Sequence, residues 1–308
     1  MSLSKSIETL LEIYKERSKE QLETFLEETG AIISDEIIQI FDELNNLILI
    51  SLCQCLYWAY SLKSERCLLL ITQVTPVIIW LHYKSLVANV KEISCSVDAL
   101  LLAIYNQVVN NQKLQKDAHL QVPNISVPSI YHKMLSGIDN TEVITPQPAT
   151  SFKYLDKISV LNRTKVVHMV WLEFNKRISL CSESSIISCC NTIIRLSCSG
   201  FKFIPTVYTK GDIDVLQDYP RFKLDSMVVK DMVSSLYFII YNGDSKLAYS
   251  ALKCLHEKVS VIVCPESILA TEALINLFEL SQQSDGDFEL MSPLNPLDFK
   301  KKFRQLLS

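Results

Sequence analysis

Ten cysteines and five histidines are the residues of this 308-residue chain that could most readily do chemistry. Cys53 and Cys55 form a C-x-C pair, which is tighter than the usual zinc spacing, and the apolar run around them suits buried thiols. No C-x-x-C occurs, and no two histidines lie within four residues of each other. His256-Glu257 begins a metalloprotease pattern, but Ser260 stands where that pattern needs a second histidine. The sequence therefore predicts no metal site.

The six glycines exclude another group of enzymes. The two closest, Gly200 and Gly211, are eleven residues apart. A glycine-rich phosphate loop needs several glycines within a few residues, so that backbone N–H groups can approach the ligand. No G-x-S-x-G nucleophile elbow is present either. We therefore predict no catalytic residue and no cofactor, and keep an unrecognised cysteine-based active site as the enzymatic alternative.

The charge balance argues against nucleic acid as a ligand. Lys and Arg together number 30 against 34 for Asp and Glu, a net charge of -4, whereas nucleic-acid binders concentrate basic residues on one face. The first thirty residues are charged throughout, so no signal peptide is expected. We expect a cytoplasmic chain whose thiols stay reduced.

Two uncharged runs, 44–62 and 67–83, approach the length of a membrane span. A helical hairpin across the bilayer at 44–83 is therefore an alternative. Pro76 and several amide and hydroxyl residues interrupt these runs, and the rest of the chain has amphipathic patterning. Buried core helices, or a surface that a partner covers, are the preferred interpretation.

Apolar residues recur mainly at the three- and four-residue spacing of amphipathic helices. Residues 4–28 form one predicted helix, with Gly30 as its stop and Ser34 or the following aspartate as the cap of the next. Ser64 is a candidate cap for a third helix. Pro76 suits the first turn of a separate fourth helix, because proline is favoured at that position.

The middle of the chain has a different character. Residues 110–156 are polar and contain four prolines, and the segment 118–135 alternates apolar and polar residues, which favours an extended segment or a short β-hairpin. Helical patterning returns at about 159. Asp225 or Ser226 opens a helix, and Asn242-Gly243 predicts a tight turn, since both residues tolerate positive φ.

These patterns predict an all-α fold, an irregular bundle of antiparallel helices. We expect a single domain over 1–285 with an internal extended loop at about 110–156. The remainder, 286–308, should be a short linker and a basic helix. Its stretch from Phe299 to Arg304 has four basic residues, three of them between two phenylalanines, which fits either a solvated helix end or contact with an acidic surface.

Several segments resemble the hyccin family in the same order. They are Val97–Asn106, Val122–His132, the helical region from Trp171 to Gly200, and Ser235–Asp244 with Leu247-Ala248 and Ala251-Leu252 behind it. The resemblance covers about 40 to 280. It implies structural motif positions without chemistry, at Ala99, Leu100, Leu101, Tyr105, Asn106, Pro128, Tyr131, Tyr241, Asn242, Gly243, Ala248 and Ala251.

The resemblance also implies partners. Hyccin-like proteins are all-α, non-catalytic subunits that pair with a tetratricopeptide-repeat protein. That pair joins phosphatidylinositol 4-kinase III alpha and an armadillo-like membrane anchor, and the complex makes phosphatidylinositol 4-phosphate at the plasma membrane. Membrane association would be peripheral and mostly indirect. For the partner surface we look to the helices at 44–90, with Leu49, Trp58 and Trp80 as candidate anchors, because aromatic and large apolar residues dominate such interfaces.

Overall fold

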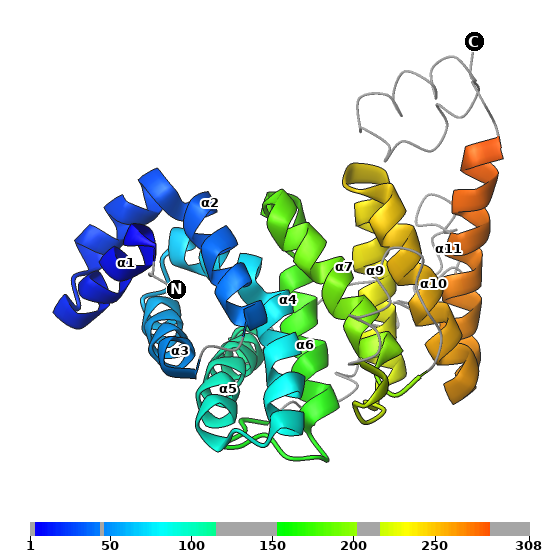
Figure 1. Ribbon diagram of the computed structural model, residues 1–308, viewed down its shortest axis with the longest axis horizontal. Coiled ribbons are helices and arrows are strands. Elements are labelled where there is room, and N and C mark those ends of the chain that lie inside the picture. Colours follow the sequence, from blue (N-terminus) through cyan, green and yellow to red (C-terminus); the bar gives the residue numbers. More distant parts are fainter. Residues whose placement is uncertain (1–3, 44–45, 115–152, 202–215, 284–308) are drawn as a thin grey trace, which may run out of the picture.

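The computed structural model describes residues 4–43, 46–114, 153–201 and 216–283, and Figure 1 shows their arrangement. Every regular element among these residues is helical, which confirms the all-α class. In chain order the helices are α1 (Lys5–Glu16), α2 (Lys19–Glu43), α3 (Asn46–Ser61), α4 (Glu65–Ala88), α5 (Lys91–Leu114), α6 (Arg163–Asn175), the 3-10 helix η3 (Ile178–Leu180), α7 (Glu183–Cys198), α9 (Ser226–Asn242), α10 (Ser245–Ile262) and α11 (Pro265–Gln283). The predicted hairpin at 118–135 and the predicted basic helix in 286–308 lie outside the described residues.

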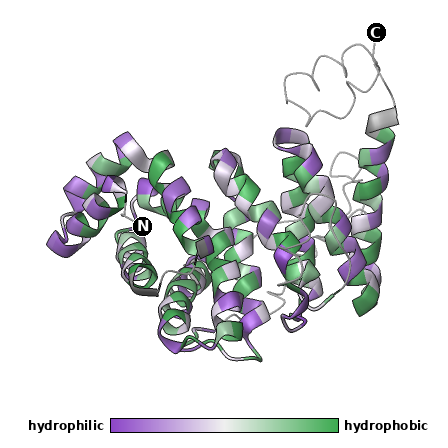
Figure 2. Cartoon of the chain, in the orientation of Figure 1, coloured by the Kyte–Doolittle hydropathy of each residue, from purple (hydrophilic) through white to green (hydrophobic). Residues whose placement is uncertain are grey.

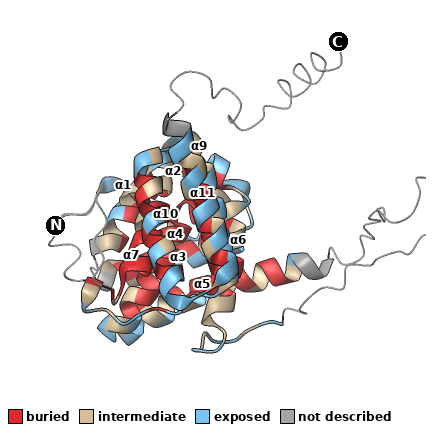
Figure 3. Ribbon diagram, turned by 90° about the vertical axis from the view of Figure 1, so that its right-hand side faces the viewer, coloured by how far each residue is buried: buried red, intermediate tan, exposed pale blue. Residues whose placement is uncertain are grey.

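The helices cross the molecule in roughly chain order, from α1 at one end to α11 at the other (Figure 1). α4 and α7 form the centre: α4 packs against α2, α5, α6 and α7, and α7 also contacts α10. One continuous cluster of buried apolar side chains extends from Ile7 in α1 to Leu274 in α11. Buried residues face inward between the helices in Figure 3. The described helices therefore share one hydrophobic core.

The predicted first helix, 4–28, is divided in the structure. α1 ends at Glu16, and Arg17 takes the left-handed backbone conformation with φ at 57°. α2 then runs through Gly30 and Ser34, so the predicted stop and start at these residues are wrong. A lone glycine weakens a helix by only about 1 kcal/mol, and packing of an apolar face overcomes that. In α2 that face is Leu22, Leu26, Ile33, Ile37 and Phe41.

α4 continues past Pro76, so the predicted helix boundary there is also wrong. Proline lacks the N–H that would bond the carbonyl four residues earlier, and its ring crowds the preceding turn. Hydroxyls of α7 donate to the carbonyls of this region: Ser185 Oγ to the Gln73 oxygen at 2.7 Å, and Thr192 Oγ1 to the Pro76 oxygen at 3.0 Å. These bonds fasten α7 to the turns on either side of Pro76, and the burial of residues 71–81 favours a continuous helix there.

Two described helices are long and apolar enough to cross a bilayer, Glu65–Ala88 and Lys91–Asn111, and α3 contributes a shorter apolar helix. In α4, 83% of the apolar window is buried inside the protein. A helix packed on all sides is apolar around its whole circumference. The central position of α4 therefore accounts for the uncharged run at 67–83 without a bilayer.

Other boundaries follow the capping signals in the sequence. Ser64 is the N-cap of α4, and Asp225 is the N-cap of α9, where its carboxylate accepts from the Ser226 N–H at 2.8 Å. α5 (Lys91–Leu114) continues past residue 110, the predicted start of the extended loop, and ends about one turn later than predicted.

Candidate functional site

The three candidate anchor residues lie in different environments. Leu49 is fully buried, and Trp80 is only 3% exposed, with its ring stacked on Tyr219 at a centroid distance of 5.9 Å. Neither side chain offers a surface in the isolated chain. Trp58 is half-buried at the surface of α3, so it is the candidate anchor that a partner could reach directly.

Trp58 lines a groove of about 500 Å³ formed by residues of α1, α3 and α5. Tyr14 from α1 and Tyr57 from α3 supply the other aromatic walls, and the rings of Tyr14 and Trp58 lie 5.8 Å apart. The side chain of Tyr57 is 49% exposed. The floor and sides carry small or uncharged side chains, Cys53, Gln54, Ser61, Cys95, Ser96 and Ala99.

The composition of α3 explains why the groove is uncharged. The helix holds no charged residue, and Figure 2 shows it as mostly hydrophobic beside the purple stretches of α1 and α2. Its inner face packs on the core through Leu49, Leu52 and Leu56. Gln54, Tyr57 and Ser61 are left facing outward. An uncharged aromatic outer face on a helix of a charged protein is the composition of an interface centre.

Arg17 carries the only charge among the described residues that line the groove. Its guanidinium carbon lies 4.2 Å from the centroid of the Tyr14 ring and 5.6 Å from that of Trp58, and Nη2 donates to the Tyr14 hydroxyl at 3.1 Å. The left-handed turn after α1 places the side chain there. These contacts hold an exposed cation across two aromatic faces.

Burial works against reactivity at four of the thiols. Burial raises the pKa of Cys53, Cys55 and Cys190 to about 12, and that of Cys181 to about 11. Thiol nucleophiles need a lowered pKa and a partner base. Cys95 is the exposed thiol among the described cysteines, and no histidine is among the described residues that line its groove. No group of three or more metal-ligating side chains occurs in the described part of the chain.

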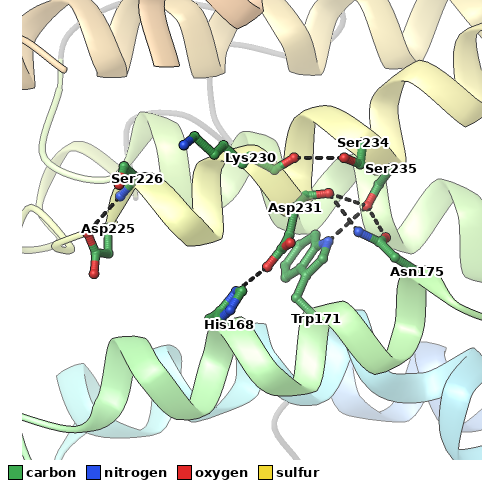
Figure 4. A network of polar contacts seen from close by, with 9 residues as sticks. All are labelled: His168, Trp171, Asn175, Asp225, Ser226, Lys230, Asp231, Ser234 and Ser235. Atoms are coloured by element: carbon green, nitrogen blue, oxygen red, sulfur yellow. Dashed lines mark hydrogen bonds and ion pairs between the residues drawn. The ribbon is translucent and has the colours of Figure 1, made fainter. Parts of the chain in front are cut away.

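A histidine and an aspartate do meet between α6 and α9 (Figure 4). His168 Nδ1 lies 2.5 Å from a carboxylate oxygen of Asp231. A catalytic triad would place a serine hydroxyl on the other ring nitrogen. The hydroxyl of Ser235 instead accepts from Trp171 Nε1 at 2.9 Å and donates to Asn175 Oδ1 at 2.6 Å. The arrangement fastens α6 to α9 and has the geometry of a structural network.

The first group of motif positions, between Ala99 and Asn106, lies in α5 and attaches residues 153–155 to that helix. Leu100, Leu101 and Tyr105 are buried in the core, and Ala99 lines the groove. The Tyr105 hydroxyl and the Asn106 amide bond the backbone of residues 153–155, so they fix that segment to α5. Pro128 and Tyr131 lie outside the described residues.

The second group lies around the α9–α10 turn. Gly243 has φ of -140°, and Asn242 ends α9, so the expected positive-φ turn is wrong. Space explains the glycine better: a Cβ on Gly243 would lie 3.2 Å from Ile239 and 3.3 Å from Ile186. Tyr241 packs its ring against Tyr237, and the buried Ala248 and Ala251 let α10 approach its neighbours closely.

Sequence reasoning missed Tyr14, Arg17 and Cys95 as groove residues. Tyr14 fitted the apolar face of a longer predicted helix, and no glycine marks the turn at Arg17. The one available signal was the absence of charge over 44–62. That signal pointed to α3 but could not reveal which helices would flank it.

A comparison with protein families gives one match that spans nearly the whole molecule. The model of the hyccin family matches residues 24–297 of the 308-residue chain. This range contains α3, α5 and every helix that follows, and it extends the range of the resemblance seen in the sequence. The chain therefore belongs to the hyccin family.

Proposed function

We propose that this chain is a non-catalytic scaffold subunit of a phosphatidylinositol 4-kinase III alpha complex. It binds and stabilises a tetratricopeptide-repeat protein, and the pair supports phosphatidylinositol 4-phosphate synthesis at the plasma membrane. The observation that carries the proposal is the family match over residues 24–297. In this role the chain contributes surface and rigidity rather than chemistry.

The groove between α1, α3 and α5 supports a binding role. Interface centres are depleted of charge and enriched in Trp, Tyr and Arg, and the residues that contribute most to affinity come from the same three types. Tyr57, Trp58 and Arg17 gather in this groove beside uncharged residues of α3 and α5. We propose Trp58, with Tyr57 beside it, as the anchor on this side of the molecule. Leu49 packs α3 on the core, whereas Trp80 contacts Tyr219 and Arg195 and is not part of the groove lining.

The chemistry of the chain fits a subunit that does not catalyse. The four thiols at Cys53, Cys55, Cys181 and Cys190 have raised pKa values, and Ser235 is engaged by Trp171 and Asn175. Kinase and anchor would be reached through the tetratricopeptide-repeat partner. Localisation is then cytoplasmic with recruitment to the plasma membrane, and contact with lipid is mostly indirect.

The test is co-expression with the tetratricopeptide-repeat subunit of the host, followed by size-exclusion chromatography with light scattering. The proposal expects a stable one-to-one complex, with this chain poorly behaved when expressed alone. Tyr57→Asp should weaken the complex, because it places a charge in the groove. Tyr237→Asp is the matched control: Tyr237 is 51% exposed on α9, far from the groove. A lone monomer that ignores the subunit at micromolar concentration would contradict the proposal.

A further inference from the structure

The groove is preformed and carries a fixed charge at its edge. Among the described residues, the Arg17 guanidinium contacts the Tyr14 hydroxyl and the two aromatic rings, and no carboxylate forms an ion pair with it. The side chain is nevertheless exposed. A guanidinium that is already oriented loses little entropy when it pairs, and its planar fork matches a carboxylate.

The shape of the groove suits one stripe of side chains. Most of its lining comes from two helices that pack against each other, α3 and α5, and α1 with the turn after it adds Tyr14 and Arg17. The groove has small side chains beside the larger Tyr57 and Trp58. They are Ser61 on α3 and Ser96 and Ala99 on α5. A third helix packs on such a pair by inserting its i, i+3/i+4, i+7 ridge between them.

We propose that this groove binds an amphipathic helix of a partner protein, with an apolar stripe in the groove and an aspartate or glutamate paired with Arg17. Charge complementarity selects this occupant, because the described walls carry one cation and no anion. The inference rests on the proposed role as a binding subunit, but not on which partner supplies the helix.

Two other occupants fit less well. An acidic membrane surface is bound by clusters of several Lys and Arg residues, whereas the described lining holds only Arg17, set in a concave site. A second copy of this chain would have to offer a free helix with the same pattern. The amphipathic α1 already buries Ile7, Leu10 and Ile13 in its own core.

The experiment uses the purified full chain and a displayed library of helical peptides. Each peptide has leucine or phenylalanine at the i, i+4 and i+7 positions and randomised residues elsewhere. The same chain with Cys95 blocked by a bulky maleimide is the counter-target, because this exposed thiol lies in the groove. Selected peptides should carry an acidic residue at one fixed position and should lose binding to the blocked chain.

Arg17 variants then test the charge pairing. Arg17→Glu should weaken a selected peptide by at least about tenfold, as loss of an interface hot spot does. A peptide with its acidic residue changed to lysine should regain binding to Arg17→Glu, which also proves that the variant is folded. Arg17→Lys should retain most of the affinity, because the charge remains.

Several results would overturn the inference. The first is a selection that yields no peptide. The second is a set of selected peptides without an acidic preference, and the third is equal binding to the chain with Cys95 blocked. Sedimentation with phosphatidylserine vesicles that depends on Trp58 would assign the groove to a membrane, and a dimer lost in Arg17→Glu would assign it to a second copy. Formation of the tetratricopeptide-repeat complex without any peptide binding would support the proposed function and contradict this inference. Peptide binding without formation of that complex would support this inference and contradict the proposed function.

Discussion

Asn106 of α5 hydrogen-bonds both backbone groups of Leu155, which lies 49 residues further along the chain. Its Oδ1 accepts from the Leu155 N–H at 3.1 Å, and its Nδ2 donates to the Leu155 carbonyl at 2.9 Å. The Tyr105 hydroxyl donates to the Lys153 carbonyl at 3.1 Å. The end of the long connection between α5 and α6 is therefore fixed by two adjacent residues of one motif.

Asn106→Asp should release this segment. Aspartate has almost the same shape, but it cannot donate, and it places a carboxylate against the Leu155 carbonyl. Losing the partner of this half-buried carbonyl should cost on the order of 1 kcal/mol. We expect faster amide hydrogen exchange over 153–158 and a lower urea midpoint. Gln107→Glu is the control, since the bond of Gln107 among the described residues goes to the exposed side chain of Asn111; an equal loss in both variants would contradict the assigned role.

Gly200→Ala and Gly30→Ala should change stability in opposite directions. Gly200 has φ of +75°, and its Cβ would lie 2.6 Å from Arg221 Cγ and 3.0 Å from the Tyr219 carbonyl oxygen. The substitution should cost about 1–2 kcal/mol or more, from the backbone conformation alone. Gly30 lies inside α2 with nothing within 4 Å of its Cβ, so alanine should add roughly 0.5–1 kcal/mol. Urea unfolding of both variants checks the signs, and destabilisation by Gly30→Ala would argue against a continuous α2.

Ser235→Ala should be far more harmful than Ser234→Ala. Ser235 is buried and serves both Trp171 and Asn175, whereas the exposed Ser234 hydroxyl donates to the Lys230 carbonyl of its own helix. The first change leaves the Trp171 N–H without its acceptor and should cost about 1–3 kcal/mol, while the second should stay within about 0.5 kcal/mol. Chemical denaturation measures both. Equal effects would mean that the network in Figure 4 does not fasten α6 to α9.

Lys258 should make the free energy of unfolding depend on pH in the alkaline range. Burial lowers its pKa from 10.5 to about 8, and Nζ donates to the Leu196 carbonyl at the end of α7. Between these two values the unfolded chain binds the proton and the folded chain does not, so the contribution of this group to stability rises with pH. Relative to Lys258→Met, the native chain should gain on the order of 3 kcal/mol across that window. Parallel curves of unfolding free energy from pH 7 to 10.5 for the two proteins would contradict the assignment.

Much of the fold could be predicted because its signals are local. Ser64 and Asp225 cap helices where the sequence places them. The errors occur where distant contacts decide. Pro76 stays helical because the turns around it are buried and packed on α7, and Gly30 stays helical because the apolar face of α2 is buried.

The groove was only partly predictable for the same reason. The uncharged run at 44–62 indicated α3 and its Trp58, but tryptophan in sequence gives no sign of its exposure, and Trp80 proved to be core. The turn at Arg17 depends on a residue type that rarely adopts positive φ. The Arg17 side chain lies beside Tyr14 and Trp58 because α1, α3 and α5 meet there, and no local signal in the sequence predicts that meeting.

The most direct test of the groove as the partner surface is the alkylation rate of Cys95, measured by mass spectrometry in the free chain and in the purified one-to-one complex with the tetratricopeptide-repeat subunit. Cys95 is the exposed thiol in the groove, and the half-buried Cys264 at the start of α11 is the internal control. Complex formation at the groove should slow alkylation of Cys95 at least about tenfold and leave the rate at Cys264 unchanged. An intact complex in which Cys95 reacts as fast as in the free chain would place the partner elsewhere and contradict the central claim.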